Sequence, residues 1–517
     1  MSLYPRKIKG FRDINANLNS VRWHIIHKAS QIYRRYGYEH WDSPILEYAE
    51  LLGKYLPDSD QVEGGVYSFR SPEQEPIYDQ KGNEKRDEHN NVLLTNHFLT
   101  LRYDLTAPLA RMYSEQVWVR FIHNQLKEGK APLFRRYQYG PVFRFEAKLD
   151  PGRFREFWQL DFDTVGADDI SVDAENVMVL ADALENIGIE RGKYIVKINN
   201  RKIVNGFLNS LGIDNEKLEQ DILRIIDKSD KIGMDGVAQE LGEGRKDKVS
   251  GAFIAGVGLD TKLISLIMNF LNTFNNEMSR ADILDKLENL NIANENFQQG
   301  LKELSIIDAI LLKLGYKEER ALFEPRLIRG MAYYTGPIFE VEYLGKYKDE
   351  KGRIRNVGSI CGGGRYDGLV KRILGIKVPA TGASIGVDRL AEVLINQSII
   401  PKYNGPVLIV VFDTKMMIEY QKLAAKLREN GVDVEIFYGN RRALKQQLSY
   451  ADKKNSPLAL LLGEDELKKN VVTVRDLRLG KELAEKITDK KQWKEQLQQQ
   501  VSLSEVIEYV KAKLKNL

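Results

Sequence analysis

Residues 143–163 have the sequence FRFEAKLDPGRFREFWQLDFD, which carries the pattern of an antiparallel β-hairpin. Two runs rich in aromatic residues flank a Pro-Gly pair, and such a pair is typical of a turn. Side chains two apart along a strand share a face, so Arg144 joins Glu146 and Gln159 joins Asp163. One surface of the hairpin thus offers a cation, two carboxylates and an amide. The alternative is a solvent-facing hairpin with ordinary cross-strand ion pairs.

Further strand patterns lie on both sides of this hairpin. They occur at residues 98–103, 137–146, 157–165, 194–198, 338–343, 357–360 and 382–385. Helical patterns lie between them, and an amphipathic helical stretch at 20–36 precedes them. Together these patterns predict the α+β class, with a mostly antiparallel sheet and helices on one face, and not a doubly wound α/β fold.

The periodicity changes twice along the chain. Residues 203–316 follow mostly a 3.6-residue period, which predicts a helical insertion that splits the sheet domain into residues 1–202 and 317–400. Short apolar strands then alternate with amphipathic helices, so residues 401–489 are expected to form a separate α/β domain with a parallel sheet. Residues 490–517 are rich in Gln and Lys and predict a helical tail.

The composition is that of a globular chain with several domains. The chain has 517 residues, of which 43% are hydrophobic and 29% charged, which excludes a disordered or fibrous protein. No apolar run approaches the ~18 residues of a membrane span, and no secretory signal is found, so a cytoplasmic protein without a membrane partner is expected. The single cysteine, Cys361, excludes an internal disulfide, and with only six histidines a protein-bound metal is not predicted.

The net charge of +4 is too small to indicate a polyanionic partner by itself. Its distribution is uneven, because residues 405–517 contain 21 Lys and Arg against 16 Asp and Glu. On charge alone, a solvated and slightly basic domain surface is the favoured interpretation.

Three further motifs are candidates for chemistry. Residues 329–343, RGMAYYTGPIFEVEY, contain a tyrosine pair that, taken alone, is more typical of a buried core than of a binding site. Residues 358–369, GSICGGGRYDGL, contain a glycine run that permits close backbone approach to a ligand or forms a plain bulge, and that matches neither the P-loop nor GxGxxG. Residues 382–394, GASIGVDRLAEVL, place Arg389 at the start of a helical pattern, where a lone arginine usually forms a surface ion pair.

In combination these motifs resemble the class II aminoacyl-tRNA synthetases. The helix, strand and proline that end at Pro44 are similar to motif 1, residues 143–146 to motif 2, and residues 386–390 to motif 3. This resemblance implies that three weak local patterns belong to one antiparallel catalytic domain.

Three segments resemble the histidyl-tRNA synthetase family in particular. They are LRYDLT at 101–106, RGMAYYTG at 329–336 and GGRYDGL at 363–369. That family also has a helical insertion between motifs 2 and 3 and a C-terminal α/β anticodon-binding domain, so the resemblance covers nearly the whole chain.

The resemblance implies a two-step ligase. Histidine and ATP would give histidyl-adenylate with release of pyrophosphate, and the histidyl group would then pass to the 3′ end of tRNA(His). ATP would be a substrate accompanied by Mg²⁺ on its phosphates. Motif 1 implies a homodimer. The alternatives are a non-catalytic paralogue that binds histidine or RNA as a regulator, and a sibling synthetase for threonine, proline or glycine.

The resemblance also implies roles for individual residues. Arg144 and Arg329 would be catalytic cations near the α-phosphate, and ATP would be bound by Arg144, Glu146 and Arg389. The attacking carboxylate is already ionised at neutral pH, so the site must supply position and positive charge rather than a general base.

Histidine itself would be held by residues from four segments. They are Asp104, Thr106, Arg144, Gln159, Asp163, Arg329, Tyr333, Tyr334 and Tyr366. The resemblance assigns Asp104, Thr106 and Gln159 to the ammonium group and Asp163 with Tyr334 to the ring. A pocket built on such hydrogen bonds rejects analogues that lack them by roughly 10⁴-fold.

Several residues depart from patterns common in the family, among them Asp104 and Asp163, which stand where many bacterial members have glutamate. Ala332 stands where an acidic residue is common, and the hairpin tip AKLDPG at 147–152 differs from the common bacterial tip. In the family this tip reads the acceptor end of the tRNA. We therefore expect the tip to change tRNA preference and to leave adenylate formation intact.

Overall fold

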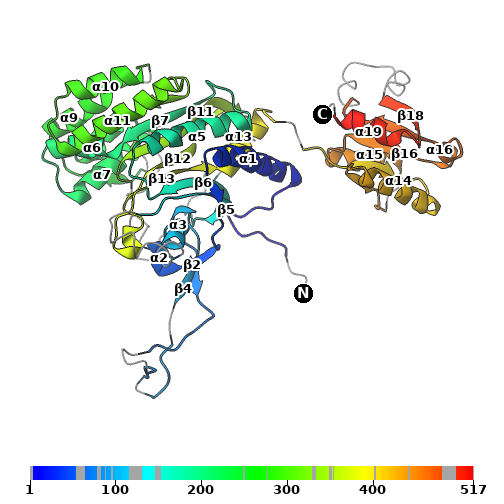
Figure 1. The fold of residues 1–517 in the computed structure, drawn as a ribbon, viewed down its shortest axis with the longest axis horizontal. Coiled ribbons are helices and arrows are strands. Elements are labelled where there is room, and N and C mark those ends of the chain that lie inside the picture. Colours follow the sequence, from blue (N-terminus) through cyan, green and yellow to red (C-terminus); the bar gives the residue numbers. More distant parts are fainter. Residues whose placement is uncertain are drawn as a thin grey trace. The chain divides into compact units, whose positions relative to one another are not determined.

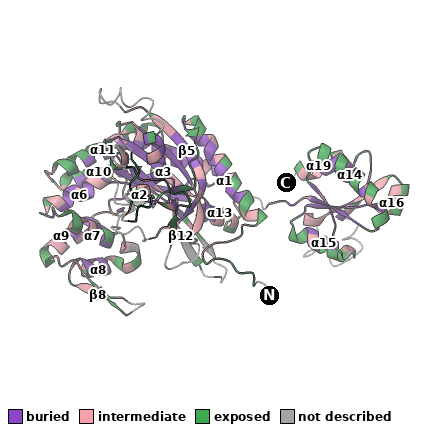
Figure 2. Cartoon of the chain, turned by 90° about the horizontal axis from the view of Figure 1, so that it is seen from below, coloured by how far each residue is buried: buried purple, intermediate pink, exposed green. Residues whose placement is uncertain are grey.

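The structure is a computed structural model. It describes residues 4–53, 65–78, 83–87, 89–94, 97–115, 131–145, 153–247, 251–275, 277–328, 334–348, 352, 354–400, 403–440, 443–479 and 497–515. The chain forms two compact units, Met1–Ile399 and Ile400–Leu517. In each unit the buried residues concentrate along the strands and on the inward faces of the helices (Figure 2).

The first unit is built on one large sheet (Figure 1). Its strands, in order across the sheet, are β1 (Glu39–His40), β5 (Phe134–Phe143), β6 (Glu156–Val165), β13 (Ala380–Gly386), β12 (Ile354–Arg365), β11 (Pro337–Lys348), β7 (Tyr194–Asn200) and β10 (Ala321–Phe323). The β1–β5 and β7–β10 pairs at its two edges are parallel, and the pairs between them are antiparallel. The α+β prediction is confirmed.

Three helices cover one face of this sheet, namely α1 (Ala16–Arg35), α5 (Ser171–Ile187) and α13 (Val387–Asn396) (Figure 1). Strand β6 shows why they pack there, because its side chains alternate between the two faces. The Phe162 ring lies 4.9 Å from the Tyr33 ring of α1, and both are fully buried. The neighbouring residues of β6 therefore point to the opposite face, where the candidate site lies.

The opposite face carries α3 (Thr106–Met112), α2 (Ala49–Gly53) and a separate small sheet of β2 (Leu46–Tyr48), β4 (Phe98–Leu101) and β3 (Ser68–Arg70). The predicted strand at 98–103 is thus real, but it belongs to this small sheet. Its partners are very short, and their sequences carry too few alternating residues to be recognised.

Between β7 and β10 the chain is mainly helical. The helices are α6 (Arg201–Ser210), α7 (Glu216–Ile226), α8 (Ser229–Leu241), α9 (Thr261–Asn272), α10 (Arg280–Asn289) and α11 (Glu295–Lys313), with a β8 (Gly244–Lys246) and β9 (Phe253–Ala255) hairpin. The predicted helical insertion is confirmed, and the hairpin was missed. Helix α6 packs closely on α11, where a Cβ at Gly206 would lie 2.7 Å from the Phe297 Cβ.

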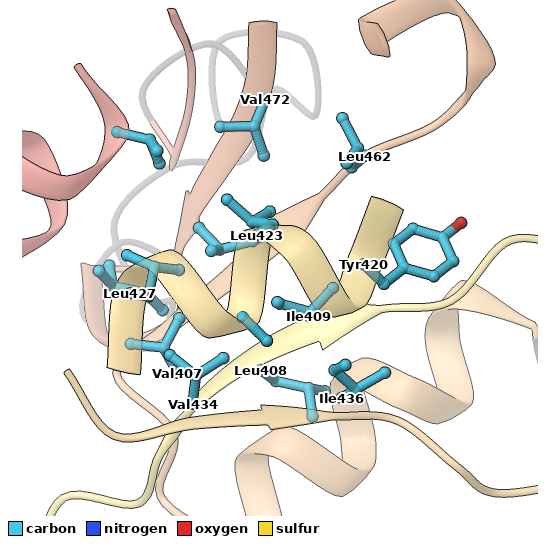
Figure 3. Close-up of a cluster of buried hydrophobic side chains, with 14 of the residues drawn as sticks. Val407, Leu408, Ile409, Tyr420, Leu423, Leu427, Val434, Ile436, Leu462 and Val472 are labelled. Atoms are coloured by element: carbon cyan, nitrogen blue, oxygen red, sulfur yellow. The ribbon is translucent and has the colours of Figure 1, made fainter. Parts of the chain in front are cut away.

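The second unit has a five-stranded sheet in the order β15 (Val434–Ile436), β14 (Val407–Val410), β16 (Leu458–Leu461), β17 (Val471–Asp476) and β18 (Gln498–Ser502). Its helices are α14 (Met417–Glu429), α15 (Leu444–Lys453), α16 (Glu464–Lys468) and α19 (Val506–Lys515). The short apolar strands expected in this domain, at 407–412, 432–437 and 457–463, correspond to β14, β15 and β16, which are parallel as expected. Tyr420, Leu423 and Leu427 of α14 point toward these strands and form the core shown in Figure 3.

The predicted helical tail at 490–517 is wrong for residues 498–502. These residues form β18, which pairs antiparallel with β17, and only the following α19 is helical. The Gln-rich sequence lacks the apolar alternation by which a strand is recognised. The reason is that β18 is an edge strand in which Val501 is buried while Gln499 and Gln500 are exposed. Residues 498–502 of the tail therefore belong to the second unit's sheet.

Candidate active site

A cavity of about 450 Å³ lies on the face of the large sheet opposite α1. Its walls come from the segment before α3, from the end of β5, from β6, β12 and β13, and from the start of α13. These segments are far apart in the chain, and strand pairing brings them together. The site is thus a product of the sheet topology and not of one local motif.

The cavity gathers the predicted site residues that the structure describes. They are Asp104, Thr106, Arg144, Gln159, Asp163, Tyr334, Tyr366 and Arg389. The other predicted site residues, Glu146, Arg329 and Tyr333, lie outside the described residues.

Two arginines hold fixed positions in the cavity wall. Arg144 donates from Nε to the Tyr103 carbonyl oxygen at 3.2 Å, and its guanidinium lies 4.4 Å from the centre of the Tyr103 ring. Arg389 donates from Nη1 to the Ser359 carbonyl oxygen at 2.6 Å. Because each side chain is anchored by one part of its planar guanidinium, the two positive charges are held in place before any ligand binds.

Asp163 is a buried carboxylate with two partners. The Tyr366 hydroxyl donates to its Oδ1, and Arg136 Nη2 lies 3.2 Å from its Oδ2, an ion pair without the alignment of a hydrogen bond. Burial raises the pKa of the Asp163 carboxyl, and the Arg136 charge opposes that rise. The Asp163 carboxylate is therefore a hydrogen-bond acceptor whose position is fixed by the Tyr366 hydroxyl.

Arg136 is fully buried on β5, directly across from Asp163 in the strand register. It donates to Gln138 Oε1 at 2.7 Å and to the Leu105 carbonyl oxygen at 2.6 Å. Sequence reasoning missed this residue, because its role follows from cross-strand register and not from any motif.

A third carboxylate in the cavity, Asp161, was also missed. Its exposed fraction is 2%, and burial followed by the negative charge of Asp163 raises the pKa of its carboxyl to about 8. The signal was present, because Asp161 lies between Gln159 and Asp163 on a strand whose alternate residues share a face.

Asp104 is oriented by the helix that follows it. Its Oδ1 accepts from the backbone N–H groups of Thr106 at 3.1 Å and Ala107 at 2.9 Å, in the first turn of α3. A carboxylate at this position is stabilised by the otherwise unpaired N–H groups of a helix start.

The glycine-rich strands are explained by close strand packing. A Cβ at Gly363 would lie 2.5 Å from the Ala383 Cα, and a Cβ at Gly364 would lie 2.7 Å from the Pro337 carbonyl oxygen. On β13, a Cβ at Gly382 would collide with the side chain of Asp163. Glycine is therefore needed both for the approach of the strands and for room around the Asp163 carboxylate.

Asp388 directly precedes Arg389 in the chain and links the start of α13 to α1 and β6. Its Oδ1 accepts from Arg22 Nε at 2.7 Å and Arg12 Nη2 at 3.1 Å, and its Oδ2 accepts from the Trp158 backbone N–H at 2.7 Å. The start of α13, which carries Arg389, is thereby tied to α1 and β6.

The described part of the chain contains neither a cluster of metal ligands nor a helix that could span a membrane. Among those residues, no three or more His, Cys, Asp and Glu side chains are grouped so that they could hold a metal ion. In the same part of the chain, each helix is too short or too polar to cross a membrane.

Comparison with known proteins gives a consistent result across the chain. A family model described as histidyl-tRNA synthetase matches residues 81–390, and one described as an anticodon binding domain matches residues 406–513. A histidine–tRNA ligase of Paracoccus denitrificans is 43% identical over 94% of this chain and 93% of its own length. One from Ruegeria sp. is 42% identical over 94% of this chain and 91% of its own length.

A solved structure shows the same fold. The crystal structure of histidyl-tRNA synthetase from Nostoc sp. has a TM-score of 0.68 at 26% sequence identity, and the match covers 99% of this chain and 100% of that one. The sequence motifs, the antiparallel sheet and the cavity agree with these matches, and the chain belongs to the histidyl-tRNA synthetase family.

Proposed function

We propose that this protein is a histidine–tRNA ligase that forms histidyl-adenylate from histidine and ATP, releases pyrophosphate, and transfers the histidyl group to the 3′ end of tRNA(His). The observation that carries the proposal is the convergence of Arg144 and Arg389 on one cavity that also contains buried hydrogen-bonding groups for an amino acid. The relatives named histidine–tRNA ligase support the same activity.

The chemistry of adenylate formation requires fixed positive charge. The carboxylate of histidine attacks the α-phosphorus of ATP, and the bond from that phosphorus to the bridging oxygen of pyrophosphate breaks. Arg144 would contact the attacking carboxylate and the α-phosphate, and Arg389 the γ-phosphate. Preorganised cations stabilise the charge that develops in this step without reorganisation. Arg329 and Glu146 are proposed to complete the ATP site.

We assign histidine recognition to the aspartates that line the cavity and to the polar residues beside them. Asp163 would accept a ring N–H, and Tyr334 would contact the other ring nitrogen. Tyr366 orients Asp163 through its hydroxyl hydrogen bond. Asp104, Thr106 and Gln159 would contact the ammonium group, and Tyr333 would line the pocket.

Mg²⁺ is proposed to arrive with ATP and not to be held by a resident protein site. The cavity aspartates already have other partners or are buried beside one another, and the described residues contain no group of metal ligands. Mg²⁺ requires near-octahedral oxygen ligands, which phosphate oxygens and water can supply.

The second unit is proposed to bind the anticodon of the tRNA. Phe412 and Tyr438 lie two residues beyond the ends of the parallel neighbours β14 and β15, and their exposed fractions are 43% and 65%. Exposed aromatic rings at one sheet edge are suited to stack on single-stranded bases. This feature and the family match over 406–513 support tRNA as the partner.

The remaining assignments follow from the family. We propose a cytoplasmic homodimer, and a first unit divided into a catalytic domain at 1–202 and 317–400 with a helical insertion at 203–316. The non-catalytic paralogue is disfavoured, because Arg144, Arg329 and Arg389 are all present in the chain.

Amino-acid-dependent exchange of labelled pyrophosphate into ATP tests the function. Histidine should support exchange, while threonine, proline and glycine should not. Exchange with threonine, proline or glycine in place of histidine would assign the protein to a sibling specificity, and binding of histidine without any exchange would make it a binding protein.

A further inference from the structure

Three buried acceptor atoms in the cavity have no hydrogen-bond partner among the described residues. One of them, Asp163 Oδ2, lies 3.2 Å from the charge of Arg136. The other two are Gln159 Oε1 and Asp161 Oδ1, which belong to alternate residues of β6 and so share a face. A buried acceptor that is left unpaired destabilises the folded protein, because it has lost its hydrogen bonds to water. Such a pair in one cavity indicates that a ligand donates to both atoms.

Ser384 orients the Gln159 amide. It lies directly across from Asp161 in the β6–β13 register. Gln159 Nε2 donates to Ser384 Oγ at 2.8 Å. The amide oxygen of Gln159 is thereby turned away from Ser384 and left for a donor.

The complementary ligand is a small cation with several N–H donors. Arg136, the buried arginine nearest in the strand register, already donates to Gln138 and Leu105 and faces Asp163. A metal ion would require more oxygen ligands than the described residues group together. A primary ammonium supplies three donors and a positive charge in the volume of a few atoms.

We infer that Asp161 is a substrate-binding residue that holds the α-ammonium group of the amino acid together with Gln159. This inference rests on the proposed function and adds a charged partner to the ammonium site. An anionic Asp161 would make the cavity select amino acids over analogues without the amine. Burial disfavours the charged form of the Asp161 carboxyl in the free protein. A bound ammonium cation would favour ionisation of Asp161, and the resulting carboxylate would favour binding of the cation.

The test compares Asp161→Asn with the natural protein on ligands that differ in the amine. L-Histidine is measured by its KM in pyrophosphate exchange. L-Histidinol, which keeps the ammonium group, and 3-(imidazol-4-yl)propionate, which lacks it, are measured by calorimetric binding. We expect Asp161→Asn to raise the KM for histidine and the Kd for histidinol by roughly 10- to 100-fold. The KM for ATP and the Kd for the propionate should stay within twofold.

Two controls separate binding from folding. Asp214→Asn changes an exposed aspartate between α6 and α7 and should behave as the natural protein. Thermal unfolding should show that Asp161→Asn is folded, and if it is not, Asp161→Ser is put through the same comparison. A loss of affinity that is equal for histidinol and the propionate, or no loss for either, overturns the inference. Neither result affects the proposed function, which depends on exchange by the natural protein.

Discussion

Arg22 and Asp388, which lie 366 positions apart in the chain, form a buried ion pair in which Arg22 Nη2 and Asp388 Oδ1 are 2.6 Å apart. The side chains are 7% and 5% exposed. The next residue after Asp388 is Arg389, whose guanidinium faces the cavity. The pair therefore links the first long helix of the chain to the position of a proposed ATP-binding cation.

Replacing Asp388 by Asn should be strongly destabilising. The change leaves the buried Arg22 without its counter-charge, and breaking such a pair costs about 3–5 kcal/mol. Denaturant unfolding measures the loss. Glu392→Gln is the matched control, because Glu392 is more exposed and lies 3.4 Å from Arg12, so its loss should stay below about 1 kcal/mol. Equal effects of the two variants would contradict this assignment.

Arg389→Ala should lower histidine-dependent pyrophosphate exchange. Removal of one preorganised donor to a developing charge typically costs about 10²–10³-fold in rate, and Arg329→Ala is expected to fall in the same range. Arg191→Ala is the control, because Arg191 is an exposed arginine paired with Glu185. Exchange at the natural rate in Arg389→Ala would remove this residue from the proposed ATP site.

The contribution of Asp161 to the stability of the ligand-free protein should fall as pH rises from about 4 to about 8. The folded-state pKa of Asp161 is about 8, above its ordinary value of 3.8, so over this window the folded state holds a proton that the unfolded state has lost. The slope from one such group is up to about 1.4 kcal/mol per pH unit. The charges that act most on Asp161 are Asp163, Arg136 and Asp104, and the cavity wall adds the cations Arg144 and Arg389. Tyr33 and Cys361 are buried nearby.

The measurement is the difference in unfolding free energy between the natural protein and Asp161→Asn at several pH values. Burial also raises the pKa of Asp173 to about 6, but that group is present in both proteins and cancels. Burial raises the pKa of Asp163 as well, and because the Asp163 charge acts on Asp161, the difference reports the titration of this pair. Burial raises the pKa of Tyr33 and of the Cys361 thiol, so neither group titrates in this window. A difference that is independent of pH would show that Asp161 is ionised in the free protein.

Phe412→Ala and Tyr438→Ala should weaken tRNA charging and spare adenylate formation. Base stacking on an aromatic side chain is worth about 1–3 kcal/mol, so each variant should raise the KM for tRNA roughly 10-fold. Tyr509→Ala on α19, beside the opposite edge strand β18, is the control. A matching loss of pyrophosphate exchange would show damage to the protein as a whole instead.

Exchanging the hairpin tip at 147–152 for the tip of another family member should change which tRNA acceptor ends are charged. The adenylate step takes place without tRNA, so pyrophosphate exchange is expected to stay unchanged. Charging of tRNA variants that differ only at the acceptor end measures the effect. Collapse of exchange in the tip variant would refute the prediction.

The repeating patterns in the sequence predicted most of the fold. Two-residue alternation on β6 placed Gln159 and Asp163 on one face, and the structure brings both into the cavity. The same rule applies to Asp161, which the family resemblance did not draw attention to. Their roles in binding stay predictions.

Features that depend on distant partners were not predictable. Arg136 and Asp388 acquire their partners only through strand register and helix docking, which no local pattern encodes. Strand β18 was hidden because its Gln residues favour helix as an isolated segment, whereas pairing with β17 decides the outcome. Tertiary context overrides local preference in both cases.

The pairing of β6 with β13 has a consequence for biosynthesis. Strand β6 is complete at residue 165, but its neighbour begins only at residue 380, after the inserted helices. At about 5–20 residues per second, the ribosome takes roughly 10 to 40 s to reach it. During that interval the edge of β6 that later pairs with β13 has no partner strand, and Asp161 and Asp163, which are buried in the folded protein, lie on this strand. A chaperone that shields unpaired strand edges would therefore act mainly in this interval.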